Sequence, residues 1–379
     1  MQKKIIALAI AGLASTAAFA QSNVTIYGIA DAYIGQVRSN GNLTSTVVGS
    51  GGLSTSRIGF KGVEDLGNGL KALFALEYRL DIDTNNNIGG DSAKWNSGVG
   101  SNSAAGPARQ QFVGLTGGFG TAVAGRLQTT AYDWMVKYNP VAATAFDVHN
   151  AMTKTGFRIN LYADARANNA VAYISPSFGG VTVALNHSFA VEQASSTVAS
   201  NLAATLVGVY FDQGPLSIGF VGEKLQGGGT LETLERTDLA LGASYAFPFA
   251  KFFVAGQTTK DNGTNNTANS GFAGKTDTVY SLGAAIPVSA KGTVLVQYAH
   301  SNYKSGSTSA NLSADNSGKG VSIAYTHDLS KRTTVYAGYG YLDNSGTQIA
   351  NSNVYSLGGT VQQPGGSSNI IATGLRHSF

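Results

Sequence analysis

The sequence contains no cysteine, and this absence excludes a disulfide framework, a thiolate zinc site and a cysteine nucleophile. Charge is also scarce: Asp, Glu, Lys and Arg make up 12% of the 379 residues, whereas about 25% is usual in soluble domains. Most basic residues stand singly, so nucleic acid is not an expected partner. The apolar fraction of 43% is too high for a disordered chain.

The N-terminus has the pattern of a secretory signal peptide. Lys3 and Lys4 precede an apolar stretch that ends at Leu13, and Ala18-Phe19-Ala20 has the small residues that signal peptidase requires. The alternative, a membrane anchor, needs an apolar stretch of about 20 residues. We expect residues 1–20 to be removed and residues 21–379 to form one domain. Loss of the two lysines lowers the formal charge from +4 to +2.

Long apolar runs are missing after Ala20, so no transmembrane helix is predicted. A closed β-barrel also satisfies its backbone in lipid, and its signal is alternation. Between Leu70 and Asp81 the apolar residues fall on one face of a strand and the charged ones on the other. The first face holds Ala72, Phe74, Leu76, Tyr78 and Leu80, and the second holds Lys71, Glu77, Arg79 and Asp81. A strand of a soluble sandwich would show the same period.

The number and rhythm of the connections favour the barrel. Seven short turns alternate with eight longer polar loops, so fifteen connections join sixteen strands. The first long loop is predicted near residues 38–52 and the third near 128–165. An even strand number, with short turns at one rim and long loops at the other, is typical of outer-membrane barrels. The last strand, near Asn369 to Phe379, can then close on the first, Val24 to Val37.

Four motifs resemble those of the Gram-negative general diffusion porins, in their betaproteobacterial form. They are Val24 to Gly28 (VTIYG) with Asp31, Ser56 to Ala72 (SRIGFKGVEDLGNGLKA), Arg109 to Leu115 (RQQFVGL) with Gly125-Arg126, and Gly374 to Phe379 (GLRHSF). In such porins the terminal aromatic residue, here Phe379, is the barrel assembly signal. The resemblance covers essentially the whole mature chain.

This resemblance implies an all-β fold, a 16-stranded antiparallel transmembrane β-barrel with an inward-folded third loop. It also implies a homotrimer in the cell outer membrane, in contact with outer-membrane lipid and lipopolysaccharide. The function it implies is passive diffusion of ions and small hydrophilic solutes through a water-filled channel. The third loop is rich in aromatic residues, among them Tyr132, Trp134 and Phe146, and is therefore expected to pack rather than float in water.

Charged residues on the lumen-facing parity of the second to sixth strands are mostly basic. They are Arg57, Lys61, Lys71, Arg79, Arg109, Arg126 and Arg166, against Glu77 and Asp81. Charged side chains in a narrow passage determine which ions enter, so a weak to moderate preference for anions is predicted. Lys61 and Lys71 flank a short turn and are expected at the periplasmic mouth. For each arginine alone, the alternative is a wall residue without influence on selectivity.

The resemblance adds roles for some of these residues. Arg57, Arg109 and Arg166 match positions that form a basic cluster at mid-height of the pore, with Glu77 and an acidic third-loop residue opposite. Asp133 and Asp147 are the two candidates for that acid, because the loop lacks the Pro-Glu-Phe-Gly-Gly motif of enteric porins.

Three other functions are alternatives to a general pore. A substrate-specific channel would have the same barrel with a binding site in the lumen, and an adhesin would be a non-conducting barrel. An enzyme is not expected, because the scattered histidines come with neither a Gly-x-Ser-x-Gly nor a His-Glu-x-x-His motif. Neither a cofactor nor a metal is predicted.

Overall fold

The computed structural model describes residues 23–39, 43–84, 88, 108–153, 166–189, 201–228, 235–261, 276–303, 316–344 and 366–379. The predicted signal peptide lies outside these residues. Among the described residues, no helix has the length and apolar character that a membrane crossing requires.

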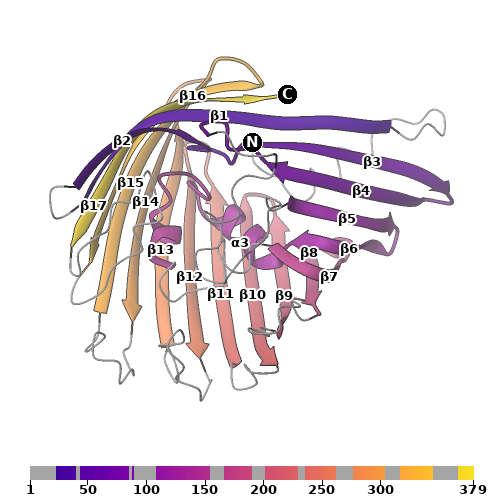
Figure 1. Cartoon of the computed structure of the whole chain (residues 1–379). Coiled ribbons are helices and arrows are strands. Elements are labelled where there is room, and N and C mark those ends of the chain that lie inside the picture. The colour runs from indigo at the N-terminus through magenta and orange to yellow at the C-terminus, as the bar shows by residue number, and fades with distance from the viewer. Residues whose placement is uncertain are drawn as a thin grey trace.

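The described strands form one antiparallel sheet in which neighbours along the chain are also neighbours in space (Figure 1). They are β1 (Asn23–Ser39), β2 (Leu43–Ser50), β3 (Arg57–Gly67), β4 (Leu70–Arg79), β5 (Ala108–Gly117), β6 (Gly120–Gln128), β7 (Arg166–Ile174), β8 (Val181–Ser188), β9 (Asn201–Gln213), β10 (Leu216–Gly228), β11 (Glu235–Ala246), β12 (Lys251–Asp261), β13 (Thr276–Pro287), β14 (Gly292–Tyr303), β15 (Asn316–Asp328), β16 (Thr333–Asn344) and β17 (Ser367–Ser378). Two short helices, α3 (Thr130–Tyr138) and α4 (Val148–Thr153), separate β6 from β7.

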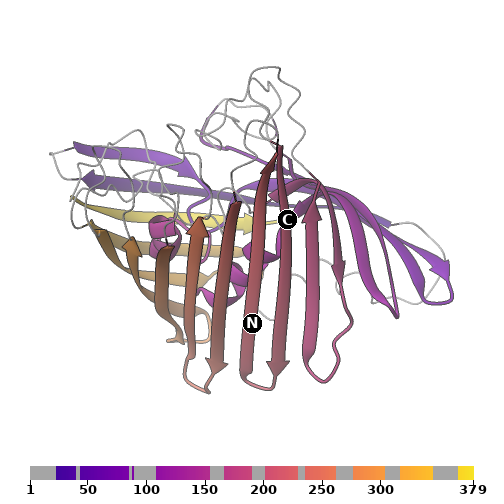
Figure 2. The same cartoon turned by 90° about the horizontal axis from the view of Figure 1, so that it is seen from below.

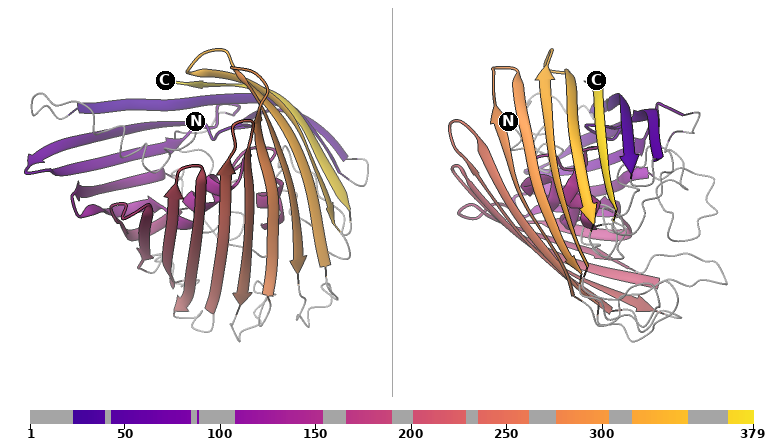
Figure 3. Two further views of the ribbon diagram at one scale, coloured as in Figure 1. Left: turned by 180° about the vertical axis from the view of Figure 1, so that it is seen from behind. Right: turned by 90° about the vertical axis from the view of Figure 1, so that its left-hand side faces the viewer.

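The sheet closes on itself through its first and last strands. β17 pairs with β1 from Ile29 opposite Ser378 to Ser39 opposite Ser368. The backbone groups of Gly28 and Phe379 exchange two hydrogen bonds of 3.0 and 3.1 Å. Figure 3 shows the yellow C-terminal strand beside the indigo first strands. Closure confirms the predicted barrel and pairs the first and last strands, which would otherwise be the edges of the sheet.

The prediction of a first long loop near residues 38–52 was wrong over most of that range. Residues 43–50 form β2, which pairs with Ala32 to Ser39 of β1, and β3 pairs with the preceding half of β1, Asn23 to Ile29. β2 and β3 are therefore two lengths of one membrane strand, and the barrel has sixteen strands as predicted. Between them residues 51–56, which we call the inward segment, leave the sheet. Gly51 begins it with a φ of +84°, a conformation that glycine adopts without strain.

The outer surface of the barrel is apolar, as the alternation predicted. Leu76, Val113, Leu241 and Ile371 are exposed on it. The residues that alternate with the outward-facing ones point inward, and many of them are polar and buried, among them Glu77 and Ser244. An apolar outer band with a polar interior is the arrangement of a membrane barrel.

The third loop folds inside the barrel. α3 contacts β8 to β12, and α4 contacts β13 to β16 (Figures 1 and 2). Trp134 and Phe146 are almost completely buried, in two separate apolar clusters against the wall. Hydrogen bonds fix the loop as well: Trp134 donates through Nε1 to the Gly219 carbonyl at 2.9 Å, and the Tyr138 and Ser217 hydroxyls lie 3.0 Å apart. The expectation of an inward-folded third loop is confirmed.

Candidate functional site

A buried carboxylate organises the basic residues on one side of the lumen. Glu77 on β4 lies 2.6 Å from Nε of Arg109 on β5 and 3.8 Å from Nη1 of Arg57 on β3. It also accepts a hydrogen bond of 3.1 Å from the Tyr27 hydroxyl on β1. Glu77 was expected to face the arginines across the pore; it lies among them on the same wall, because neighbouring strands bring these side chains together. Charge-assisted hydrogen bonds of this kind hold both partners firmly in place.

Arg109 reaches the lumen only because β5 is irregular. Glu77 pairs with Gln110, and the next pair is Tyr78 with Ala108, so Arg109 is the extra residue of a register shift. Simple alternation from Val113 would turn Arg109 toward the lipid. A bulge re-aims one side chain while the rest of the strand keeps its faces. Here it places Arg109 against Glu77, with 5% of the side chain exposed.

Arg166 extends the basic wall toward the third loop. Its guanidinium lies over the Tyr132 ring of α3, 4.2 Å from the centroid, and donates to the Gln128 side chain at 3.1 Å. The Gln128 amide in turn donates to Asp133 Oδ1. Asp133 is therefore the third-loop acid that is linked to an arginine.

Asp147 has a different place. It is completely buried and accepts hydrogen bonds from the Asn139 side chain at 2.8 Å and from the Ala143 and Asn150 amides at 3.0 Å. These three donors fold the bend between α3 and α4. Burial raises the pKa of Asp147 to about 6, against these hydrogen bonds. Asp147 thus shapes the loop and does not face the arginines.

Two further arginines lie beside this group. Arg79 pairs with Arg57 in the register and bonds to Asp81 at 2.6 Å. Arg126 pairs with Gln111 and donates to the Ala108 carbonyl and to the Asn168 side chain. The register of β6 and β7 shifts between Gly125 and Leu127, so simple alternation fails at Arg126 as well. The structure does not place it among the residues around Glu77.

The predicted mouth residues lie at different heights. Lys71 pairs with Asp65 next to the turn between β3 and β4. Lys61 lies further up the wall, opposite Ala75, and its Nζ sits 5.1 Å from the centroid of the Tyr27 ring. Phe379 covers Gly28 at the β1–β17 seam, where a Cβ on Gly28 would lie 2.3 Å from the phenyl ring.

Sequence reasoning missed a second charged group on the lumen face of β10 and β11. Arg236 lies 2.6 Å from Asp238 and 3.5 Å from Glu223, and all three side chains are buried. The alternation of β11 with outward Leu239 and Leu241 was the signal that could have found them. In the part of the chain that the structure describes, no cluster of three or more His, Asp or Glu residues could hold a metal ion.

Comparisons with known proteins agree with this geometry. A family model described as Gram-negative porin matches residues 7–347. Outer membrane porin protein 32 of Delftia acidovorans is 33% identical over the full length of both chains. Major outer membrane protein P.IB of Neisseria meningitidis is 27% identical, again over both full lengths.

Solved structures show the same fold. An anion-selective porin from Comamonas acidovorans superposes with a TM-score of 0.74 at 28% identity, over 95% of this chain and all of that one. Salmonella typhi OmpF has a TM-score of 0.66 at 16% identity, over 94% of this chain and 98% of that one.

Proposed function

We propose a selectivity filter for this channel, because the chain belongs to the Gram-negative porin family and is a general porin of the outer membrane. The filter consists of Arg57, Arg79, Arg109 and Arg166 on the wall, with the third loop beside them, and it favours small anions. The observation that carries the proposal is the excess of guanidinium groups: among the described residues of this wall, four arginines lie with two carboxylates, Glu77 and Asp81.

The size of the effect follows from Coulomb's law. A unit charge about 7 Å from an ion in water changes its energy by about 0.6 kcal/mol, close to the thermal energy. One net positive charge therefore raises the local anion concentration, and lowers the local cation concentration, by a factor of about 2 to 3. Similarity to a porin named as anion-selective supports the same sign.

Removal of two arginines tests the filter. The double substitution Arg57→Ala and Arg109→Ala should reduce the permeability ratio of chloride to potassium by about threefold or more, because each lost charge contributes a factor of about 2 to 3. The reversal potential in a potassium chloride gradient across a planar bilayer measures this ratio. Arg332→Ala, in the exposed turn before β16, is the control and should leave the ratio unchanged. An unchanged ratio in the double variant would contradict the filter.

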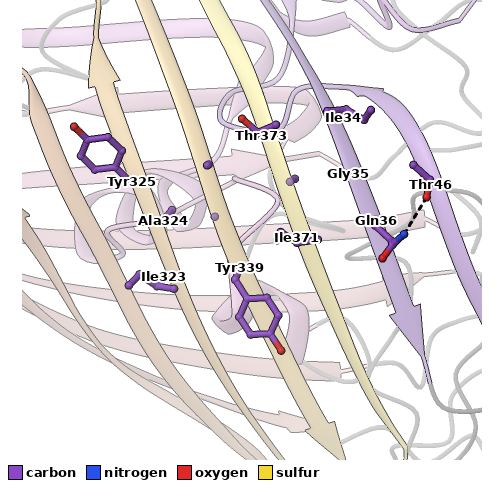
Figure 4. Close-up of a pocket in the computed structure, with 13 residues that line it drawn as sticks. Ile34, Gly35, Gln36, Thr46, Ile323, Ala324, Tyr325, Tyr339, Ile371 and Thr373 are labelled. Atoms are coloured by element: carbon purple, nitrogen blue, oxygen red, sulfur yellow. Dashed lines mark hydrogen bonds between the residues drawn. The ribbon is translucent and has the colours of Figure 1, made fainter.

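A homotrimer is the proposed assembly, and a concave apolar part of the outer surface supports it. Strands β15 to β17, β1 and β2 line this hollow, which we call the outer groove (Figure 4). Ile323, Ala337, Tyr339 and Ile371 are among the residues that line it. The Gln36 amide, at one edge, donates to the Thr46 hydroxyl at 3.3 Å. We assign the groove to a neighbouring copy of the chain; lipid acyl chains are the alternative occupant.

An oversized side chain in the outer groove distinguishes the two occupants. Ala337→Trp should give folded monomers on non-denaturing gels, since the indole occupies space needed by the neighbour, whereas lipid tails adapt to it. Val254→Trp, on the outer face of β12, is the matched control and should remain trimeric. A trimeric Ala337→Trp barrel would assign the groove to lipid.

A further inference from the structure

Asp31 on β1 is a fully buried aspartate in the middle of the barrel wall. Its Oδ2 accepts hydrogen bonds from the backbone amides of Leu53 and Ser54 at 2.9 and 2.6 Å. Its Oδ1 accepts one of 2.5 Å from the Tyr336 hydroxyl on β16. A buried carboxylate persists only when it is well hydrogen-bonded, and here three donors surround it.

The backbone of Asp31 holds the same inward segment. Its carbonyl accepts hydrogen bonds from the Gly51 amide at 2.8 Å and from the Ser56 hydroxyl at 3.0 Å, and its amide donates to Ser56 Oγ at 2.9 Å. Both ends and the centre of the inward segment are therefore attached to one residue. Arg376 on β17 adds a hydrogen bond of 3.2 Å to the Ser54 side chain.

The inward segment contacts both sides of the proposed filter. The Thr55 carbonyl accepts a hydrogen bond of 3.0 Å from Nε of Arg57, which fixes the direction of that guanidinium. The Gly52 carbonyl accepts one of 2.7 Å from the Ala145 amide of the third loop. Leu53 packs in the same apolar cluster as Phe146.

We propose that Asp31 is a positioning residue of the pore constriction, which sets the place of the third loop and the direction of Arg57 through the inward segment. The inference rests on the proposed filter for the part that concerns Arg57, and on the fold alone for the third loop. An aspartate suits this place because one carboxylate oxygen receives two amides while the other receives the tyrosine.

Asparagine is the conservative replacement. Its Oδ1 can accept from the amides of Leu53 and Ser54, and its Nδ2 can donate to the Tyr336 hydroxyl, which then accepts. Asp31→Asn should therefore retain the inward segment, whereas Asp31→Ala removes the acceptor of the buried Leu53 amide and of the partly buried Ser54 amide. Tyr336→Phe removes the single hydrogen bond from the Tyr336 hydroxyl to Asp31. Tyr33→Phe is its control, because it removes a hydroxyl from a tyrosine of the same apolar cluster.

Single-channel recordings of folded variants test the proposal. Asp31→Ala should show more open-channel current noise as the third loop loosens, and its chloride-to-potassium permeability ratio should fall by about twofold as Arg57 moves. Asp31→Asn should behave like the wild type. Tyr336→Phe should raise the noise to a smaller degree, with Tyr33→Phe unchanged, and it supplies the test if Asp31→Ala does not fold.

Two results would overturn the inference. One is wild-type noise and a wild-type permeability ratio in a folded Asp31→Ala channel, which would show that the aspartate only stabilises the barrel. If Asp31→Ala does not fold, the same result in Tyr336→Phe would have the same meaning. The other is an Asp31→Asn channel as noisy as Asp31→Ala, since charge would then matter in place of hydrogen-bond geometry. Failure of the filter itself appears separately, as an unchanged ratio in the Arg57→Ala and Arg109→Ala channel, and leaves the noise test intact.

Discussion

Asp133 is a residue through which pH can act on the pore. It lies on α3, bonded to Gln128 and close to Arg166, and it is partly buried. Burial raises its pKa to about 7, while the Gln128 amide and the charge of Arg166 oppose the rise. A carboxyl with a raised pKa is neutral below that value and negative above it. The basic wall therefore has more net positive charge at pH 6 than at pH 8.

This shift predicts a pH-dependent selectivity. The preference for chloride should increase as the pH falls from 8 to 6, by about twofold, which is the effect of one unit charge near the ion path. Reversal potentials at the two pH values measure it. Asp133→Asn should strongly reduce the dependence, and Asp65→Asn, near the end of β3, should preserve it. Equal pH dependence with and without Asp133 would contradict the assignment.

Individual residues also show which positions in the lumen could be predicted from the sequence. The alternation of β3 and β4 placed Arg57, Glu77 and Arg79 on the lumen wall, because the sheet is regular there. Arg109 was also predicted on that wall, but strict alternation from the outward-facing Val113 would turn it toward the lipid. The shift of β5 that brings it inward has no sequence signal. The sequence offered Asp133 and Asp147 equally, since only the folded loop shows that Asp147 receives three internal donors.

At the scale of elements, α3 packs closely against the barrel wall because glycines on the wall, which have no side chain, leave room for it. A Cβ on Gly219 or Gly242 would lie 2.5 Å from the Tyr138 ring, and one on Gly208 would lie 2.4 Å from Thr130. The aromatic composition predicted that the loop packs inside, but the receiving surface is formed by glycines on β9 to β11. The sequence contains 49 glycines, and nothing in it distinguishes these three from the others.

Refilling one of these spaces should move the loop. Gly242→Ala must displace Tyr138 by about 1 Å to restore an ordinary carbon–carbon contact of 3.5 to 4.0 Å. The shift is directed away from the wall into the lumen, so the single-channel conductance should fall. Gly256→Ala, on β12, is the matched control, because the nearest atom to its added Cβ lies 4.0 Å away. Equal conductance in both variants would show that the loop does not lie against this wall in the open channel.

At the scale of the whole molecule, the continuous apolar outer surface and the β1–β17 seam make the chain a membrane protein. The strand number and the closure were predictable from the rhythm of turns and loops. The interruption between β2 and β3 was not, because residues 38–52 are mostly Ser, Thr, Gly and Asn, a composition that a polar loop shares with this strand.

Placing a charge on the outer surface should impair the barrel as a unit. Leu76→Arg faces the lipid on β4 and should destabilise the folded barrel by about 2 to 4 kcal/mol if the residue lies near the bilayer midplane. Urea unfolding in lipid vesicles measures the loss. Leu329→Arg, in the turn between β15 and β16, should have little effect, because its side chain lies at the rim. Equal stability of the two variants would argue against a lipid-facing Leu76.

The most direct test of the account is the current through the purified, folded protein in a planar bilayer with a potassium chloride gradient. A trimeric open pore with the arginine filter should give large ohmic conductance steps that close in threes, and a reversal potential with the sign of a chloride preference. A potassium preference would contradict the arginine filter, and silence from a demonstrably folded barrel would contradict the open pore.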